Sequence, residues 1–389
     1  MLMLKKTIAA LSLLSILAAC QSDENPSQPE PKPRQDINLT RAEQEFMDKG
    51  TDFAFRFFDQ VCSTEKEKPN VFVSPLSASL CLSMITNGAT DNTLAEMQNV
   101  LGFPANTFSL DDLNNYNQKL TSALLDLDNT TQLGIANSIW IEEGFKVYDS
   151  FVDVNKKMYD AQVQELDFTS PTAKDVINQW CATQTNNCIK EVIQEIPADA
   201  RMYLINALYF KGIWKSQFDK SATGQDNFTN VDGSQQKVAM MNQTATFNYT
   251  QTDDFSIAEL PYGNEAFSMV ILLPSGDKTL DESLPNLNYE NWKQWSKNMV
   301  GKELQIKLPR FKVEYDKELE EDMIAMGMKD AFDAYKAKFA NMSDAELYIG
   351  LLQQFTYINV DEEGTEAAAV TVGAVSYTHL RAHETLSDL

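Results

Sequence analysis

Residues that could carry out chemistry are few in this chain of 389 residues, and their spacing matches no catalytic arrangement. Both histidines, His379 and His383, lie at the C-terminal end, so the body of the chain offers no Ser-His-Asp or Cys-His catalysis and no histidine-based metal site. No C-x-x-C pair occurs among the cysteines, which are Cys20, Cys62, Cys81, Cys181 and Cys188. The nucleophile-elbow, P-loop and dinucleotide-binding motifs do not occur either. We therefore predict a protein that is not an enzyme and uses neither a metal nor a cofactor.

The first cysteine, Cys20, stands at the end of a segment typical of a signal peptide, where it could carry a lipid. Residues 1–19 hold two lysines and then an apolar run that is too short to span a bilayer core of about 30 Å. This segment ends in small residues and resembles a bacterial lipoprotein signal peptide, whose cleavage would leave Cys20 as the lipidated first residue. The acidic residues after Cys20 resemble an export signal of surface lipoproteins. They imply a protein held at the outer membrane by this lipid alone and facing the extracellular space, with a periplasmic orientation as the open alternative.

The composition after the cysteine divides the chain into a tether and a domain. Residues 20–40 are polar and rich in proline, so they cannot bury a core and are predicted to be a tether. The chain carries 32 basic and 56 acidic residues, a net charge of −24, which argues against nucleic acid as a partner. Hydrophobic residues make up 43% of the sequence, enough for a sizeable core. A monomer is expected.

Apolar periodicity predicts one α+β domain that begins near residue 41. Phe46, Phe53, Phe57 and Val61 share one helical face, and a second helix should start after Ser74 and end near residue 87. Strand-like apolar runs cover residues 133–141, 202–210, 256–263, 267–274 and 304–313. Helical patterns lie between them at 175–184 and 317–328. Neither an internal repeat nor a long linker divides this region.

Several motifs in this region are similar to those of one family. NVFVSPLSASLCLSMITNGATDNTLAEMQNVLGF (70–103) resembles the helical opening of the serpins, and LINALYFKGIWKSQFD (204–219) resembles their central strand and following turn. LPRFKVEYDKELEEDMIAMGMKDAF, FANMSD and VDEEGTEAAAVT follow in the order and spacing of that family. The resemblance implies the serpin fold, with large mixed or antiparallel sheets, surrounding helices and an exposed reactive-centre loop near the C-terminus.

The resemblance also implies roles for individual residues. Ser74, Ser77 and Asn206 match the polar shutter beneath the centre of the large sheet, where strands part. Trp214 matches the tryptophan of the breach, where the loop first enters the sheet. Gln354 stands where many serpins have a histidine, and its amide still donates and accepts hydrogen bonds. That substitution puts a pH response of the shutter in doubt. Helix capping and packing by the serines and the tryptophan are compatible with these roles.

The loop itself carries the clearest functional pattern. The resemblance assigns its hinge to Glu362, Glu363, Gly364, Thr365, Glu366, Ala367, Ala368, Ala369, Val370 and Thr371. A strand inserted into a sheet buries alternate side chains, and on one face these are all small: Thr365, Ala367, Ala369, Thr371 and Gly373. The only charge, that of Glu366, lies on the opposite face, which is expected to point to solvent.

This pattern favours a suicide inhibitor of a serine protease, with a cysteine protease as an alternative target. The protease would cut the loop near Thr378, and the freed strand would then insert into the sheet. Two alternatives stay open. One is a non-inhibitory serpin-fold binding or storage protein, and the other is a solute-binding or adhesive surface lipoprotein.

Two departures from the family limit these expectations. Asn187 and Cys188 replace the usual glycine and lysine, and a Cys181–Cys188 disulfide is conceivable beside the alternative of two partly buried thiols. Cys62 and Cys81 fall on helical faces and are expected in the core. Residues 375–389 do not resemble the two buried strands that should end a serpin, so the domain at 41–374 is expected to be incomplete and this polypeptide to fold poorly.

The tail generates a prediction of its own. VSYTHLRAHET, residues 375–385, is similar to a conceptual translation of a transposon-type sequencing adapter. We therefore expect residues 375–389 to be non-native and the genomic locus, when sequenced again, to continue after Ala374 with a different open reading frame. Recovery of the codons for SYTHLRAHET in genomic DNA would contradict this expectation.

Overall fold

The computed structural model describes residues 32–230 and 233–377. The predictions for the signal peptide (1–19), the lipidated Cys20, the scissile region near Thr378 and residues 378–389 lie outside these residues. In the described part of the chain, no helix is both long and apolar enough to cross a membrane.

Four helices open the domain, and the strands follow with further helices between some of them. The helices are α1 (Arg41–Thr64), α2 (Pro75–Thr86), α3 (Asp91–Leu101), α4 (Leu110–Asp126), α5 (Asp149–Tyr159), α6 (Ala173–Gln184), α7 (Leu280–Ser283), α8 (Tyr289–Lys297) and α9 (Glu320–Met326). The strands are β1 (Gln132–Glu142), β2 (Gln162–Leu166), β3 (Ala200–Ile213), β4 (Gly224–Thr229), β5 (Gln235–Gln251), β6 (Phe255–Pro261), β7 (Ser268–Pro274), β8 (Val300–Pro309), β9 (Phe311–Glu318), β10 (Leu347–Val360) and β11 (Gly364–Tyr377).

The first two helices confirm the sequence prediction. Helix α1 begins at Arg41 because Thr40 caps it, with the Thr40 hydroxyl and the Glu43 carboxylate each accepting from the other's backbone N–H. Its buried residues are Phe46, Phe53, Phe57 and Val61. Helix α2 begins after Ser74, whose side chain accepts a hydrogen bond from the backbone of Ser77. This cap fixes both serines beneath the large sheet.

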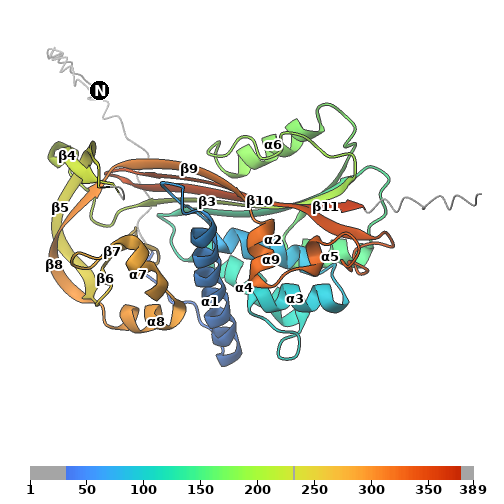
Figure 1. Ribbon diagram of the computed structural model, residues 1–389, viewed down its shortest axis with the longest axis horizontal. Coiled ribbons are helices and arrows are strands. Elements are labelled where there is room, and N and C mark those ends of the chain that lie inside the picture. The colour runs from blue at the N-terminus through green and yellow to red at the C-terminus, as the bar shows by residue number, and fades with distance from the viewer. Residues whose placement is uncertain (1–31, 231–232, 378–389) are drawn as a thin grey trace, which may run out of the picture.

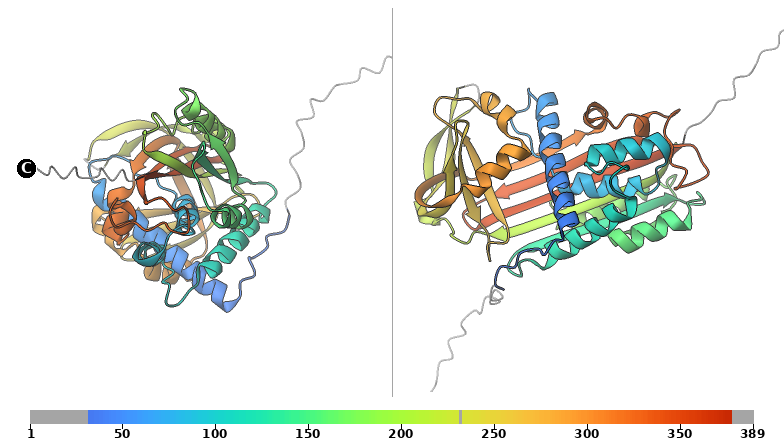
Figure 2. Two further views of the ribbon diagram at one scale, coloured as in Figure 1. Left: turned by 90° about the vertical axis from the view of Figure 1, so that its right-hand side faces the viewer. Right: turned by 90° about the horizontal axis from the view of Figure 1, so that it is seen from below.

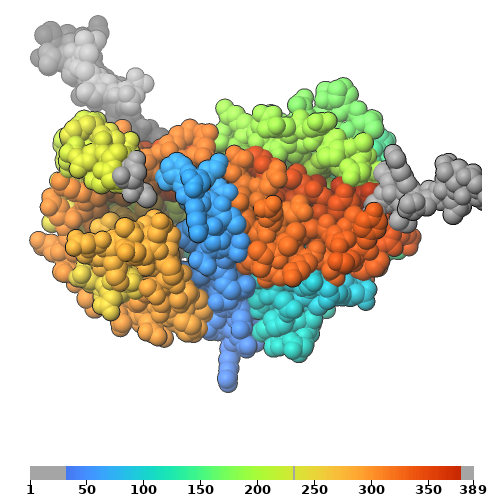
Figure 3. Space-filling model, viewed as in Figure 1, coloured from blue at the N-terminus to red at the C-terminus, as the bar shows by residue number. Residues whose placement is uncertain are grey.

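The fold is organised around a six-stranded sheet in the order β2-β1-β3-β11-β10-β9. Figure 1 shows this sheet edge-on, with α6 on one face and the other large helices on the opposite face. Figure 2 shows those helices lying across the second face, and Figure 3 shows the same layering in the filled molecule. A second sheet, β4-β5-β6-β7 with β8 beside β5, stands at one end of the first.

The small-residue segment is the fourth strand of the large sheet. Strand β11 pairs antiparallel with β3 on one side and with β10 on the other, over nearly its whole length. The sequence predicts an exposed loop before cleavage and an inserted strand afterwards, and the structure has the inserted arrangement. The strand continues past Ala374 to Tyr377, and Val375 is fully buried.

The cysteines of the described chain are free thiols, so the conceivable Cys181–Cys188 disulfide is absent. Cys181 points from α6 into the core beneath that helix, whereas Cys188 lies beyond the helix end and is only partly buried. Burial raises the pKa of Cys181 to about 12 and that of Cys188 to about 11. Both thiols are therefore protonated at neutral pH and poorly suited to thiolate chemistry.

Candidate functional site: the inserted strand and its supports

One face of β11 points toward α2, and its alternate residues are the small ones that the sequence singles out. Thr365 accepts a hydrogen bond from the Tyr262 hydroxyl at 2.6 Å, and Thr371 lies 2.8 Å from the Ser77 hydroxyl. A Cβ added at Gly373 would lie 2.6 Å from the Cδ1 atom of Ile85 on α2. A side chain at residue 373 would therefore have to displace the end of the Ile85 side chain beneath the sheet.

The opposite face of β11 is less exposed than the sequence suggests. Val370 and Val372 are fully buried, and Ala374 is 3% exposed, in a core that includes Ile177 of α6. Only Glu366, nearer the hinge, is partly exposed. The expectation of a solvent face fails for most of the strand because α6 and the segment after it cross this side of the sheet, an arrangement that strand alternation cannot reveal.

The shutter residues Ser74, Ser77 and Gln354 meet around Thr371. The Gln354 amide donates to the Thr371 hydroxyl at 2.8 Å and to the Ser74 carbonyl at 3.0 Å, while its oxygen accepts from the Ser74 backbone N–H at 2.7 Å. An amide thus satisfies a buried site with one donor group and one acceptor, without a charge. Thr371, assigned by sequence only to the hinge, is the residue that joins the inserted strand to this network.

Asn206 lies opposite Thr371 in the register but uses a different partner. Its amide donates to the Asn137 side chain at 2.9 Å, and Asn137 donates in turn to the Tyr159 carbonyl at 2.7 Å. The Asn206 side-chain oxygen is buried and has no hydrogen-bond partner among the described residues. The structure therefore places three of the four predicted shutter residues in one network and the fourth beside it.

The hinge enters the sheet through a close backbone approach at Gly364. A Cβ at this position would lie 2.0 Å from the Gly212 carbonyl oxygen, so no other residue fits without moving the backbone of β3. Trp214 follows β3, stacks on Tyr262 with ring centroids 4.4 Å apart, and donates its indole N–H to the Asp361 carbonyl at 2.8 Å. The predicted breach tryptophan therefore holds the chain just before the hinge.

The two glutamates before Gly364 differ in environment. The Glu362 side chain is only 3% exposed, and it accepts hydrogen bonds from Arg310 at 2.5 Å and from the Thr223 hydroxyl at 2.7 Å. Burial acts to raise the pKa of Glu362, but these two donors outweigh it and hold the pKa below its ordinary value. Glu363 forms an exposed ion pair with Lys220. Only the Arg310–Glu362 pair is sufficiently buried to anchor the hinge strongly.

This geometry agrees with comparisons with known proteins. The family model described as "Serpin (serine protease inhibitor)" matches residues 48–386. This chain is a serpin. Members of the family are generally protease inhibitors and not enzymes. An "uncharacterized serpin-like protein" of Methanosarcina acetivorans is 35% identical over 327 residues, which are 82% of this chain and 76% of the relative. Serpin B6 of Macaca fascicularis is 36% identical over 313 residues, which are 78% of this chain and 82% of the relative.

Solved structures of serpins described as latent or cleaved resemble this one. The thermophilic serpin tengpin in its latent state gives a TM-score of 0.79 at 32% identity and covers 88% of this chain and 92% of its own. Cleaved serpin 42Da gives a TM-score of 0.81 at 30% identity, with 86% and 91% covered. The six-stranded sheet of this serpin thus has counterparts in chains whose state is described as latent or cleaved.

The shutter predicts a response to a single substitution. Because Gln354 does not titrate, the rate of loop insertion in the wild type should change little between about pH 5.5 and 8. In Gln354→His, protonation of a buried imidazole disfavours the inserted form, so insertion should slow as the pH falls through about 6.5. Native gel electrophoresis of loop-exposed and inserted protein measures this rate. Gln354→Met, which cannot titrate, should slow insertion equally at every pH, and a pH-independent Gln354→His variant would contradict the assignment.

The hinge predicts a pH-dependent loss of stability. Arg310→Met leaves Glu362 as a buried carboxylate without its cation and should destabilise the inserted form at pH 7 by about 1–3 kcal/mol. Because the depressed pKa of Glu362 favours the inserted form only above its ordinary value of 4.5, the difference from the wild type should shrink as the pH falls below that value. Denaturant unfolding at several pH values tests this. Lys220→Met, at the exposed pair, is the control and should have little effect, and equal losses in both variants would contradict the prediction.

Proposed function

We propose that this serpin inhibits a serine protease, or alternatively a cysteine protease, as a suicide substrate whose cleaved loop becomes β11. The observation that carries the proposal is the inner face of β11. Its small side chains fit between the sheet and α2, and Thr371 completes a polar network that a loop outside the sheet could not reach. A serpin that never inserts its loop has no physical need for this match.

The mechanism follows from where the strand begins and ends. Gly364 enters at one end of the sheet beside Trp214, and the strand runs along the whole sheet to Tyr377. A protease covalently attached through an acyl bond just beyond the strand would be carried along that length as insertion proceeds. Deacylation needs an aligned base and a preorganised oxyanion hole, so distortion of the protease would leave the acyl-enzyme trapped.

Insertion of the loop also releases the free energy that moves the attached protease. The uninserted sheet would leave β3 and β10 without the strand that now pairs with both, and insertion forms two ladders of backbone hydrogen bonds. It also buries Val370 and Val372 completely. The loop-exposed form is therefore held by a kinetic barrier and not by its free energy alone.

We further propose that the inhibitor acts outside the cell, anchored to the outer membrane through lipid on Cys20. The support is the sequence pattern before residue 41, with its signal-like segment, Cys20 and the acidic residues that follow. Two residues within the proposed tether, Lys32 and Arg34, contact the domain. Lys32 pairs with Asp126 at 3.0 Å, and Arg34 donates to the Glu265 carbonyl at 3.2 Å.

A charge on the inner face of the loop tests the proposal. In Thr365→Arg, a cation would have to enter the packed space beside Tyr262, so insertion should stall and the protease should complete hydrolysis. The protein with its natural sequence after Ala374 restored should then be cleaved as a plain substrate, with its SDS-stable protease complex reduced at least about tenfold. Denaturing gels of inhibitor–protease mixtures measure this.

Thr365→Ser is the matched control, because it keeps the small volume and the hydroxyl that meets Tyr262. It should form the complex as the wild type does. An SDS-stable complex of undiminished yield with Thr365→Arg would show that the inner face of the loop does not control inhibition.

A further inference from the structure

We propose that Tyr209, oriented by Asn186, captures Glu366 as the loop begins to enter the sheet and so directs the cleaved loop toward inhibition. This inference rests on the proposed function and adds a positioning residue to it. Tyr209 lies on β3 and faces the same side of the sheet as α6. Neither the shutter nor the breach includes it.

The contact joins the inserted strand to the stationary part of the sheet. The Tyr209 hydroxyl donates to the Glu366 carboxylate at 2.6 Å, and the Asn186 amide donates to the same hydroxyl at 3.2 Å. A hydroxyl has only one proton to donate. Because Asn186 occupies its acceptor side, that proton is directed toward Glu366.

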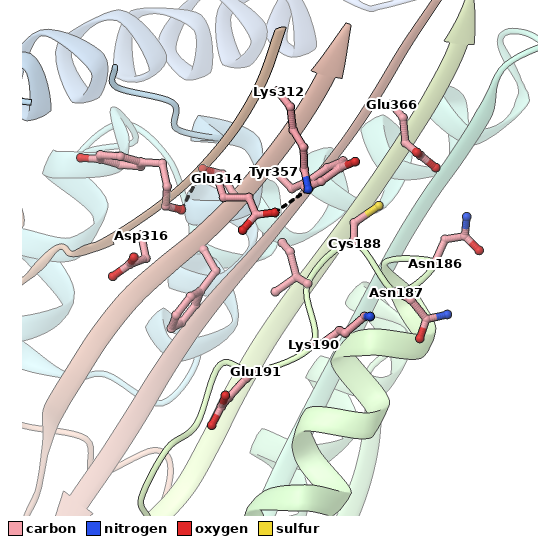
Figure 4. A pocket seen from close by; sticks show the side chains of 14 residues that line it. Asn186, Asn187, Cys188, Lys190, Glu191, Lys312, Glu314, Asp316, Tyr357 and Glu366 are labelled. Carbon is pink, nitrogen blue, oxygen red and sulfur yellow. Dashed lines mark hydrogen bonds and ion pairs between the residues drawn. The ribbon is translucent and has the colours of Figure 1, made fainter. Parts of the chain in front are cut away.

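Asn186 is well placed for this role by its backbone. It follows the C-terminal end of α6 and has a left-handed φ of 50°, as does Asn187 with a φ of 63°. Asparagine tolerates this conformation better than most residues. The turn that they form brings the segment after α6 back over the sheet, where Asn186 and Glu366 line the same cavity of about 650 Å³. Figure 4 shows both side chains on one side of this cavity, beside β3.

Glu366 needs such a partner because it is the only charged residue in β11. Lys312, across the cavity, is paired with Glu314 at 2.7 Å. Lys190 also lines the cavity, and Lys211 lies opposite Glu366 in the register of β3 and β11. The hydrogen bond that the Glu366 carboxylate accepts comes from the Tyr209 hydroxyl, and we infer that this contact stabilises the carboxylate in the sheet. A charge-assisted hydrogen bond is stronger than a neutral one, so its removal should be measurable.

The position of Glu366 means that its contact with Tyr209 forms early in insertion. Thr365 and Glu366 are the first two residues after the Gly364 hinge, so their side chains are the first to reach the sheet. Tyr262 meets Thr365 on the inner face, and Tyr209 meets Glu366 on the outer face, each at 2.6 Å. These two contacts would form while the protease is still able to deacylate, and they therefore influence the partition between inhibition and release.

The chain offers a matched control on the same strand. Tyr203 also lies on β3 and faces the same side of the sheet, and it is 1% exposed. Its hydroxyl has no hydrogen-bond partner among the described residues. Tyr209→Phe and Tyr203→Phe thus remove the same atom from the same strand, but only the first removes a contact with the loop.

The test compares these variants in the full-length protein with a serine protease that cleaves the loop. Tyr209→Phe should raise the number of inhibitor molecules consumed per protease inhibited by about two- to tenfold, the fold-change that corresponds to the net contribution of a typical hydrogen bond. The association rate constant should not change, because Tyr209 acts after cleavage. Asn186→Gly, which keeps the left-handed backbone and loses the amide, should raise the stoichiometry less. In Glu366→Ala, adding Tyr209→Phe should have no further effect.

The outcomes separate this inference from the proposed function. If the wild type forms no SDS-stable complex with any protease that cuts the loop, the proposed function fails and this inference fails with it. If the wild type forms the complex and Tyr209→Phe has the wild-type stoichiometry, only the capture of Glu366 is overturned. Equal increases for Tyr209→Phe and Tyr203→Phe would overturn it too, since they would show a general effect of lost hydroxyls on β3.

Discussion

The pairing of β11 with β3 and β10 is the interaction on which the rest of this structure depends. These three strands form the centre of the large sheet, and the helices on both faces are packed against a sheet that already contains β11. The other features of the site either leave space for β11 to enter the sheet or bind it once it is there. Gly364 permits the close backbone approach at the entrance, and Trp214 fixes the chain before it.

The two faces of β11 meet different demands. Toward α2 the side chains of the strand must be small, because Ile85 lies against Gly373. On the same face, Thr371 completes the polar network of Gln354. Toward α6 the strand is mostly apolar, and Val370 and Val372 join the core beneath that helix. A substitution in β11 therefore acts through volume on one face and through burial on the other. The single charge, Glu366, is tolerated because it lies near the entrance, where the outer face is still open.

Sequence reasoning found the elements whose patterns are local. The buried face of α1, the start of α2 and the alternation in β11 all follow from spacing and caps within one segment. It failed where partners come from distant segments. The apolar run at 304–313 is two strands, because the chain passes between sheets at Arg310. Three further features depend on packing between segments far apart in the chain. They are the hydrogen bond between Asn206 and Asn137, the burial of β11 beneath α6, and the contact of Tyr209 with Glu366.

The central claim is that the loop-exposed protein is not at its free-energy minimum and that insertion of residues 364–377 releases the difference. Thermal unfolding of the same protein before and after a single cut in the loop tests this claim most directly. The midpoint should rise by at least about 10 °C after cleavage, which at roughly 2–4 °C or less per kcal/mol corresponds to a gain of at least a few kcal/mol for a domain of this size. An unchanged or lower midpoint in the cleaved protein would contradict it and would favour a serpin that binds without inserting its loop.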